Sequence, residues 1–177
     1  GEDGVKKLAG SHVLVVGLGG VGAYAAEQLA RAGIGTMTII DSDTVNVTNK
    51  NRQLLALDST LGRPKVDVMA DRIRDINPEI NVIPINQYLK DQSIIDLMAQ
   101  PFDFIVDAID TLAPKVFLLY YAVQNKQKIV SCMGAGGKFN PEMIQITDIS
   151  KSYNCRLAFY IRKRLHRLGI REGITVV

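Results

Sequence analysis

Mostly apolar segments alternate along the chain with segments whose apolar residues recur every three to four positions. Residues 12–17 (HVLVVG) and 36–41 (TMTIID) have the nearly continuous apolar character of parallel strands buried on both faces. Between them, residues 21–33 (VGAYAAEQLARAG) are rich in alanine and end at a glycine, which favours a helix. The first part of the chain is therefore predicted to fold as strand, helix and strand.

The alternation continues through most of the remaining sequence. The predicted helices are residues 65–76, 91–100 and 112–126, and the predicted strands are residues 80–86, 102–110 and 127–136. Pro84 cannot donate a ladder hydrogen bond, so its strand is expected near an edge of the sheet. Helices and strands at this spacing predict an α/β fold: a Rossmann-like, mainly parallel sheet with helices on both faces.

The tail of the chain departs from this regular alternation. Residues 142–150 (EMIQITDIS) alternate as a half-exposed strand does, and residues 154–169 form an amphipathic segment. The apolar face of this predicted helix comprises Leu157, Ile161, Leu165 and Leu168. The sequence contains no repeat or low-complexity linker, so residues 1–177 are predicted to form one domain. Because the sequence begins at Gly1 and ends on the apolar GITVV, we expect further residues at both termini.

Composition narrows the class of protein without identifying it. Apolar residues make up 47% and charged residues 22% of the chain, which is ordinary for a globular domain. The longest plain apolar run, residues 116–123, is too short to cross a bilayer, and a net charge of +3 does not by itself indicate nucleic acid. Two cysteines without a C-x-x-C pair argue against disulfides and a cysteine-rich zinc site, and favour a reducing cytoplasm.

A glycine-rich turn joins the first strand to the first helix. Gly17, Gly19 and Gly22 fit the pattern G-x-G-x-x-G, with Gly20 between them, and Asp41 ends the second strand about 20 residues further on. Glycines let the backbone approach a phosphate at a helix N-terminus, and the acid accepts a hydrogen bond from a ribose hydroxyl. In this context we expect a bound nucleotide rather than an empty tight turn. The motif leaves open which nucleotide binds.

The loop after Asp41 is unusual for a dehydrogenase. Its polar residues are Asp43, Asn46, Asn49, Asn51 and Arg52, and Lys65 follows in the first turn of the next helix. This is the edge of the sheet where α/β proteins bind ligands. A cation at a helix N-terminus is unfavourable by about 0.3–1 kcal/mol unless an anion compensates for it. Singly, Arg52 and Lys65 are typical of solvated surface cations; together, after a phosphate-binding turn, they indicate a triphosphate clamp.

The fourth predicted strand ends with two carboxylates, Asp107 and Asp110. Because Mg²⁺ typically binds one or two carboxylates together with phosphate oxygens, these two residues are candidate metal ligands. An acid at a strand-to-helix junction also often caps the helix. Both interpretations of Asp110 stay open on the residues alone.

Combined in this order, the motifs resemble those of the ubiquitin-activating-enzyme-like adenylyltransferases, the ThiF group. The stretches that carry the resemblance are GLGGVG, IIDSDTVNVTNKNRQ, GRPKV, INPEI and VDAIDT, between Val13 and Gly137. The resemblance implies an ATP-binding variant of the dinucleotide-binding sheet, in which ATP and Mg²⁺ are used to adenylate a carboxylate. Residues 1–177 would then form one adenylation domain.

The resemblance also implies roles for individual residues. Asp41 matches the family's ribose-binding acid, and Asp110 matches its Mg²⁺-associated acid. The implied ATP site comprises Gly17, Gly19, Gly20, Gly22, Asp41, Asp43, Asn49, Arg52 and Lys65. The implied catalytic residues are Arg52, Lys65 and Asp110. In this family an arginine from the partner subunit commonly completes the site, so the resemblance also implies a homodimer.

Within the family, the chain is most similar to the tRNA threonylcarbamoyladenosine dehydratase branch. The matching stretches are residues 29–53, 106–115 and 134–152. This branch implies a tRNA substrate whose modified adenosine is adenylated and then closed into a ring, with release of pyrophosphate and AMP.

Three alternatives remain on the sequence. Activators of ubiquitin-like sulfur carriers usually have a C-x-x-C soon after the segment that matches residues 143–149, where this chain has Cys155 alone. An NAD-dependent oxidoreductase would leave Arg52, Lys65 and Asp110 without a shared role. A non-catalytic scaffold would bind ATP without releasing AMP or pyrophosphate.

The predicted last helix is rich in basic residues. They are Arg156, Arg162, Lys163, Arg164, His166 and Arg167. A solvated polar face is the ordinary explanation of such a cluster, and contact with a tRNA phosphate backbone is the alternative.

Overall fold

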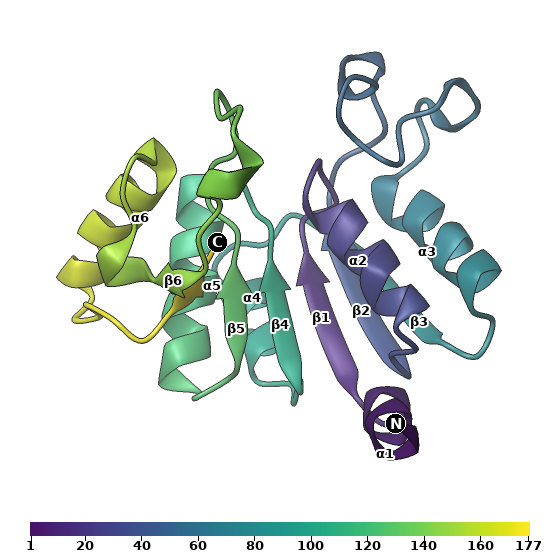
Figure 1. The fold of residues 1–177 in the computed structure, drawn as a ribbon, viewed down its shortest axis with the longest axis horizontal. Coiled ribbons are helices and arrows are strands. Elements are labelled where there is room, and N and C mark those ends of the chain that lie inside the picture. The colour runs from purple at the N-terminus through teal and green to yellow at the C-terminus, as the bar shows by residue number, and fades with distance from the viewer. The chain divides into compact units, whose positions relative to one another are not determined.

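The computed structural model describes residues 1–177 (Figure 1). The chain forms two compact units. Unit 1 comprises residues 1–88 and 102–108, and unit 2 comprises residues 89–101 and 109–177. Six α-helices and seven mostly parallel strands confirm the predicted α/β class. The expectation that residues 1–177 form one adenylation domain stays a prediction.

Unit 1 is built on four parallel strands: β1 (His12–Val16), β2 (Thr36–Asp41), β3 (Asn81–Asn86) and β4 (Phe104–Asp107). β1 lies between β2 and β4, and β3 forms the edge beside β2. The edge position of β3 confirms the expectation for Pro84. In β1 the residues Val13–Val16 are all nearly inaccessible to solvent, as expected for a strand covered on both faces.

The helices of unit 1 are α1 (Glu2–Ala9), α2 (Gly22–Arg31) and α3 (Lys65–Ile76), with short 3₁₀ turns η1 (Val47–Asn49) and η2 (Asp58–Thr60). Figure 1 shows α2 and α3 side by side. The turn after β1 and the long loop after β2 both leave the carboxyl ends of their strands. These two segments therefore lie where an open α/β sheet binds its ligand.

Unit 2 contains the strands β5 (Ile129–Ser131), β6 (Thr147–Asp148) and β7 (Thr175–Val176). Its helices are α4 (Gln92–Met98), α5 (Leu112–Gln124) and α6 (Arg156–Arg167), with 3₁₀ turns η3 (Pro141–Met143) and η4 (Ile149–Lys151). β7 pairs in parallel with β5 and antiparallel with β6, and both α4 and α6 pack against α5. None of the helices in the structure has the length and apolar character needed to cross a membrane.

The predicted strand at residues 142–150 is wrong for most of its length. Only Thr147–Asp148 are extended and paired, and 3₁₀ turns occupy the segments on either side. The Asn140 side chain accepts a hydrogen bond from the Glu142 N–H at 3.0 Å, and Asp148 accepts one from the Ser150 N–H at 2.8 Å. Such local side-chain bonds compete with the strand ladder, and the alternation of apolar residues does not reveal them.

Two further features of the tail differ from the sequence analysis. The buried face of α6 consists of Ala158, Ile161 and Leu165, whereas Leu168 is 39% exposed because the helix ends at Arg167. The apolar C-terminal segment contains β7, which the sequence analysis does not predict and which finds its partners in β5 and β6. The N-terminal helix α1 is likewise not predicted.

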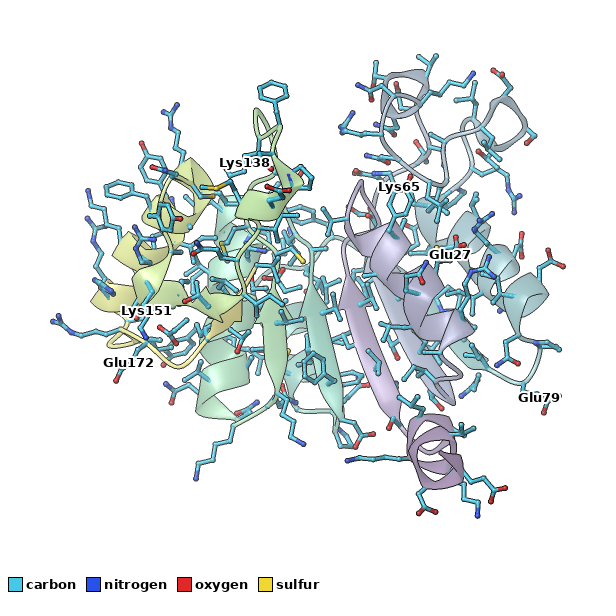
Figure 2. The ribbon with its side chains drawn as sticks, in the orientation of Figure 1. Glu27, Lys65, Glu79, Lys138, Lys151 and Glu172 are labelled. Atoms are coloured by element: carbon cyan, nitrogen blue, oxygen red, sulfur yellow. The ribbon has the colours of Figure 1, made fainter.

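Glu27 connects α2 to α3 and is only 8% exposed (Figure 2). Its carboxylate accepts hydrogen bonds from Arg72 Nε at 2.7 Å and from Arg31 Nη2 at 2.8 Å. The bond from Arg72 lowers the pKa of the Glu27 carboxyl, burial opposes this, and Arg31 adds to the lowering, so that the net pKa lies below its usual value.

The substitution Glu27→Gln should reduce the free energy of unfolding near neutral pH by about 1–3 kcal/mol, because charge-assisted bonds to two arginines are lost. Since the pKa is lowered in the folded state, the contribution of the carboxylate is present above its unfolded pKa, about 4.3, and is lost as pH falls through the folded value. Denaturant unfolding of Glu27→Gln should therefore depend less on pH below about 5. Glu79→Gln, at an exposed turn, is the control; equal losses in the two variants would contradict this role of Glu27.

Candidate nucleotide-binding site

The turn after β1 is shaped by contacts that leave no room for a side chain at Gly22. A Cβ there would lie 1.8 Å from the carbonyl oxygen of Gly17 and 3.0 Å from the Cβ of Ala108. Gly17 has φ of 89°, a conformation that favours glycine. The sequence pattern thus corresponds to a backbone that only glycine can form at these two positions.

The other two glycines are not required by the protein itself. A Cβ on Gly19 would lie 3.7 Å from Gln53 Nε2, and one on Gly20 would lie 3.5 Å from Arg52 Cγ, both ordinary contact distances. Neither glycine has a positive φ. Close approach of a ligand to the backbone gives these positions a reason to lack side chains.

The N-terminus of α2 is open to an anion. Its N-cap residue, Val21, forms no side-chain hydrogen bond, and the first turn of the helix contains no acidic residue. The Ala23 N–H donates to the carbonyl oxygen of Gly19 at 3.4 Å, whereas the N–H groups of Gly22 and Tyr24 and the positive end of the macrodipole remain available to a phosphate. This local geometry is what the glycine motif predicts.

Asp41 links the two loops at this edge of unit 1. One carboxylate oxygen accepts a hydrogen bond from the Leu18 N–H at 2.6 Å, and the other accepts one from the Asp43 N–H at 2.8 Å. A carboxylate has about four acceptor positions, so both oxygens can still accept a bond from a ribose hydroxyl. The acid of the motif thus also fixes the turn that would hold the phosphates.

Lys65 lies at the start of α3 (Figure 2), and its side chain is only 5% exposed. Its Nζ donates to Asp43 Oδ2 at 2.8 Å. The sequence analysis expects an anionic ligand to compensate for this cation at a helix N-terminus; the structure provides a carboxylate of the chain itself. The two explanations are compatible, because an ammonium group has three donors and Asp43 occupies one of them.

The loop between these residues is held by reciprocal bonds in η1. The Asn46 side chain accepts from the Thr48 N–H at 2.9 Å, and the Asn49 side-chain oxygen accepts from the Asn46 N–H at 3.0 Å. This capping arrangement leaves the NH₂ group of Asn49 available as a donor. The amide of Asn49 is therefore oriented by the loop rather than by a ligand.

Arg52 lies against the glycine turn, since a Cβ added at Gly20 would meet its Cγ and its carbonyl oxygen, each at 3.5 Å. Its Nη1 donates to the carbonyl oxygen of Thr48 at 3.2 Å and to Asn51 Oδ1 at 2.9 Å. The residue is exposed, so the remaining guanidinium donors can reach an anion. The structure thus gathers the predicted residues of unit 1 at one edge.

Asp110 belongs to unit 2, where it is exposed and lies just before α5. The N-cap of α5 is Thr111, and no side chain forms a capping hydrogen bond there, so the structure does not support a capping role for Asp110. No group of three or more His, Cys, Asp or Glu side chains is placed to hold a metal ion. The assignment of Asp110 to Mg²⁺ stays a prediction.

The sequence analysis does not single out Lys115, which is fully buried in α5. Lysine is almost never fully buried unless its charge is paired. A single lysine inside the apolar segment APKVFLLYY is the signal that could have identified it.

Replacing Asp43 with asparagine should leave the nearly buried Lys65 ammonium without its carboxylate. We expect the free energy of unfolding to fall by about 1–3 kcal/mol. We also expect ATP to raise the melting temperature of Asp43→Asn more than that of the wild type, because a phosphate of ATP then supplies the negative charge that the Lys65 ammonium has lost. The matched control is Asp58→Asn, which breaks the surface pair with Lys50, where the Asp58 side chain is 88% exposed. Equal ATP-induced shifts in both variants would exclude phosphate from the vicinity of Lys65.

Comparison with known proteins shows which family of sequences and structures this chain is similar to. The model of the ThiF family matches residues 1–175. The tRNA threonylcarbamoyladenosine dehydratase of Bacillus subtilis is 41% identical over 177 residues, which cover all of this chain and 70% of the relative. The molybdopterin-synthase adenylyltransferase of Escherichia coli is 43% identical, but over 111 residues, 63% of this chain and 44% of that protein.

Among solved structures, the crystal structure of the E. coli tRNA N6-threonylcarbamoyladenosine dehydratase in complex with ATP superposes with a TM-score of 0.97 at 41% identity. The match covers 99% of this chain and 75% of that chain. The same enzyme has been solved in complex with AMP. This chain spans about 62% to 70% of the length of the curated dehydratases from these two bacteria.

Proposed function

The chain belongs to the ThiF family, and on that premise we propose that it is an ATP-dependent tRNA threonylcarbamoyladenosine dehydratase. The observation that carries the proposal is similarity along the whole chain to enzymes of that activity, at 41% identity and a TM-score of 0.97 with an ATP complex. Activators of sulfur carriers match less of the chain, 63% in the case of the molybdopterin-synthase enzyme. Activation of a carrier protein's C-terminal glycine is therefore the second candidate.

The reaction requires two displacements at the modified adenosine. In the first, an oxygen of the side-chain carboxylate attacks the α-phosphorus of ATP, and pyrophosphate leaves. In the second, a nitrogen of the same side chain attacks the activated carbonyl carbon, AMP leaves with the former carboxylate oxygen, and the nitrogen loses its proton. The net change in the nucleoside is the loss of one water, and no nucleophile of the protein is needed.

The residues of unit 1 can bind and orient ATP for this chemistry. The open N–H groups of α2 face the phosphates, Asp41 accepts from the ribose, and Asn49 donates to a phosphate oxygen. Arg52 and Lys65 supply positive charge where negative charge is transferred to the leaving pyrophosphate. Holding the acceptor carboxylate in line with the α-phosphorus would supply the rest of the acceleration.

Asp110 has the chemistry of a ligand for the Mg²⁺ that would accompany ATP in adenylation. Its carboxylate is exposed and takes part in none of the ion pairs or hydrogen bonds of the structure, so hard oxygen ligands remain free for a cation. When bound, Mg²⁺ would neutralise charge on the phosphates.

The proposal also includes the family's homodimer, which light scattering of the full-length protein would test by a mass twice that of the chain.

A cytoplasmic location is consistent with Cys132 and Cys155, neither of which forms a disulfide. A sulfur-relay or carrier protein as partner belongs to the second candidate function.

To test the proposal, full-length protein would be incubated with ATP, Mg²⁺ and tRNA carrying the open modified adenosine, followed by mass analysis of the nucleosides. We expect ATP-dependent loss of one water, with one AMP released for each nucleoside closed. Arg52→Ala should lower kcat by about 10²–10³, as loss of a charge-stabilising donor does elsewhere. Arg63→Ala, which removes an exposed arginine paired with Asp71, is the control and should react as the wild type does.

Two results would contradict the proposal. An unchanged nucleoside, together with AMP formation in the presence of a ubiquitin-like carrier, would favour the second candidate. Cyclisation that continues without ATP would exclude the adenylation mechanism itself.

A further inference from the structure

The positive charge of the chain is concentrated in one segment. Residues 149–171 contain seven lysine or arginine residues and no aspartate or glutamate. The rest of the chain has 14 basic and 18 acidic residues, and is therefore net negative. The modest overall charge of +3 conceals this asymmetry, which is centred on α6.

Four of the five arginine and lysine residues of α6 lie on one face of the helix, together with Tyr160. Arg156, Tyr160, Lys163, Arg164 and Arg167 are spaced at i, i+4, i+7, i+8 and i+11, which places them on one face. We call this set the α6 stripe. The opposite face, formed by Ala158, Ile161 and Leu165, is 0–1% exposed and packs within unit 2. The stripe therefore points away from the core and into solvent.

None of these cations forms an ion pair within the fold. Ion pairs form at Arg31, Lys50, Arg63, Lys65, Arg72 and Arg74, and none of these residues belongs to α6. Arg162, outside the stripe, is different: it donates to the carbonyl oxygen of Ser152 at 2.7 Å and holds the segment before the helix. Like charges that neighbour each other on one helix face repel, so the stripe slightly destabilises the helix unless an anion lies along it.

Exposed aromatic rings lie among the cations. Tyr160 is 39% exposed and the Arg156 guanidinium lies 5.8 Å from the centre of its ring. Phe159 is 52% exposed, and its ring packs edge-on against that of Tyr160 at 5.4 Å. Arginine next to exposed aromatic rings is the combination that RNA-binding surfaces use for phosphates and unstacked bases.

We propose that the α6 stripe is the surface on which the phosphate backbone of tRNA docks. The proposal rests on the proposed function, because that function requires a tRNA substrate. A line of four cations along twelve residues of helix matches a polyanion better than it matches a small ligand. A membrane surface is a poorer match, because helices that lie on lipid insert their apolar face, and here that face is buried in unit 2.

The test compares two double variants of the full-length protein. Lys163→Ala/Arg167→Ala removes two cations of the stripe, and Lys6→Ala/Lys7→Ala removes two exposed cations from α1. Binding to an unmodified tRNA transcript would be measured over a series of salt concentrations. For the α6 variant we expect Kd to rise on the order of tenfold and the slope of log Kd against log salt to become shallower by about 2, as expected for two lost phosphate contacts.

Three controls accompany the binding measurement: a charge-conserving variant, the kinetic constants and circular dichroism. Lys163→Arg/Arg167→Lys conserves charge and should bind tRNA as the wild type does. In the dehydration assay the α6 variant should show a higher KM for tRNA with kcat and ATP affinity little changed, since the ATP-binding residues lie in unit 1. Circular dichroism would confirm that each variant is folded; alanine is favourable in a helix.

The outcomes separate failure of this inference from failure of the proposed function. If the wild type dehydrates tRNA but the α6 and α1 variants bind it equally well, the stripe is not the docking surface. If the α6 variant loses binding to phosphatidylserine vesicles while keeping wild-type affinity for tRNA, the stripe serves a membrane. If the wild type neither binds nor modifies tRNA, both the inference and the proposed function are overturned.

Discussion

The carboxylate of Asp41 holds together the part of unit 1 that forms the candidate nucleotide site. Parallel pairing of β1 with β2 aligns Val16 with Ile40, so the residues just beyond these strands meet. There, Asp41 accepts one hydrogen bond from the turn after β1, at Leu18, and one from the loop after β2, at Asp43. The same carboxylate thus aligns the N-terminus of α2 with the loop that carries Asn49 and Arg52. Such preorganisation reduces the conformational entropy that these loops would otherwise lose on binding a nucleotide.

Charge pairing distinguishes the interior of unit 1 from the surface of unit 2. In unit 1 the buried charges have partners: Glu27 bonds to two arginines, and Lys65 bonds to Asp43. A buried charge without a partner would be strongly destabilising, so these pairs are required by the fold as well as by the site. The cations of the α6 stripe face solvent and have no carboxylate partner. Their arrangement costs the fold little, and the proposed role in binding tRNA explains why they lie on one face.

The sequence predicts those parts of the structure that depend on local pattern. The buried strands, the helices α2, α3 and α5, and the edge position of Pro84 follow from apolar periodicity and from the chemistry of proline. The glycine spacing predicts the turn, and the structure explains it by the 1.8 Å contact at Gly22.

The prediction fails at residues 142–150, where the side chains of Asn140 and Asp148 stabilise turns. Nor does it reveal that Asp43 pairs with Lys65 across 22 residues, because that contact exists only once the loop has folded. The role of Asp110 as a Mg²⁺ ligand stays a prediction, because a metal ion and phosphates lie outside what a local pattern can place.

The most direct test of the account is a competition titration of the full-length protein with ATP and NAD⁺. The G-x-G-x-x-G turn and Asp41 are compatible with either nucleotide, whereas Arg52 and Lys65 favour the one with a triphosphate. We predict saturable ATP binding that requires both cations, and no displacement of ATP by an equal concentration of NAD⁺. Displacement of ATP by NAD⁺, or ATP affinity unchanged when Arg52 and Lys65 are replaced, would contradict the assignment of this edge of unit 1 to the triphosphate.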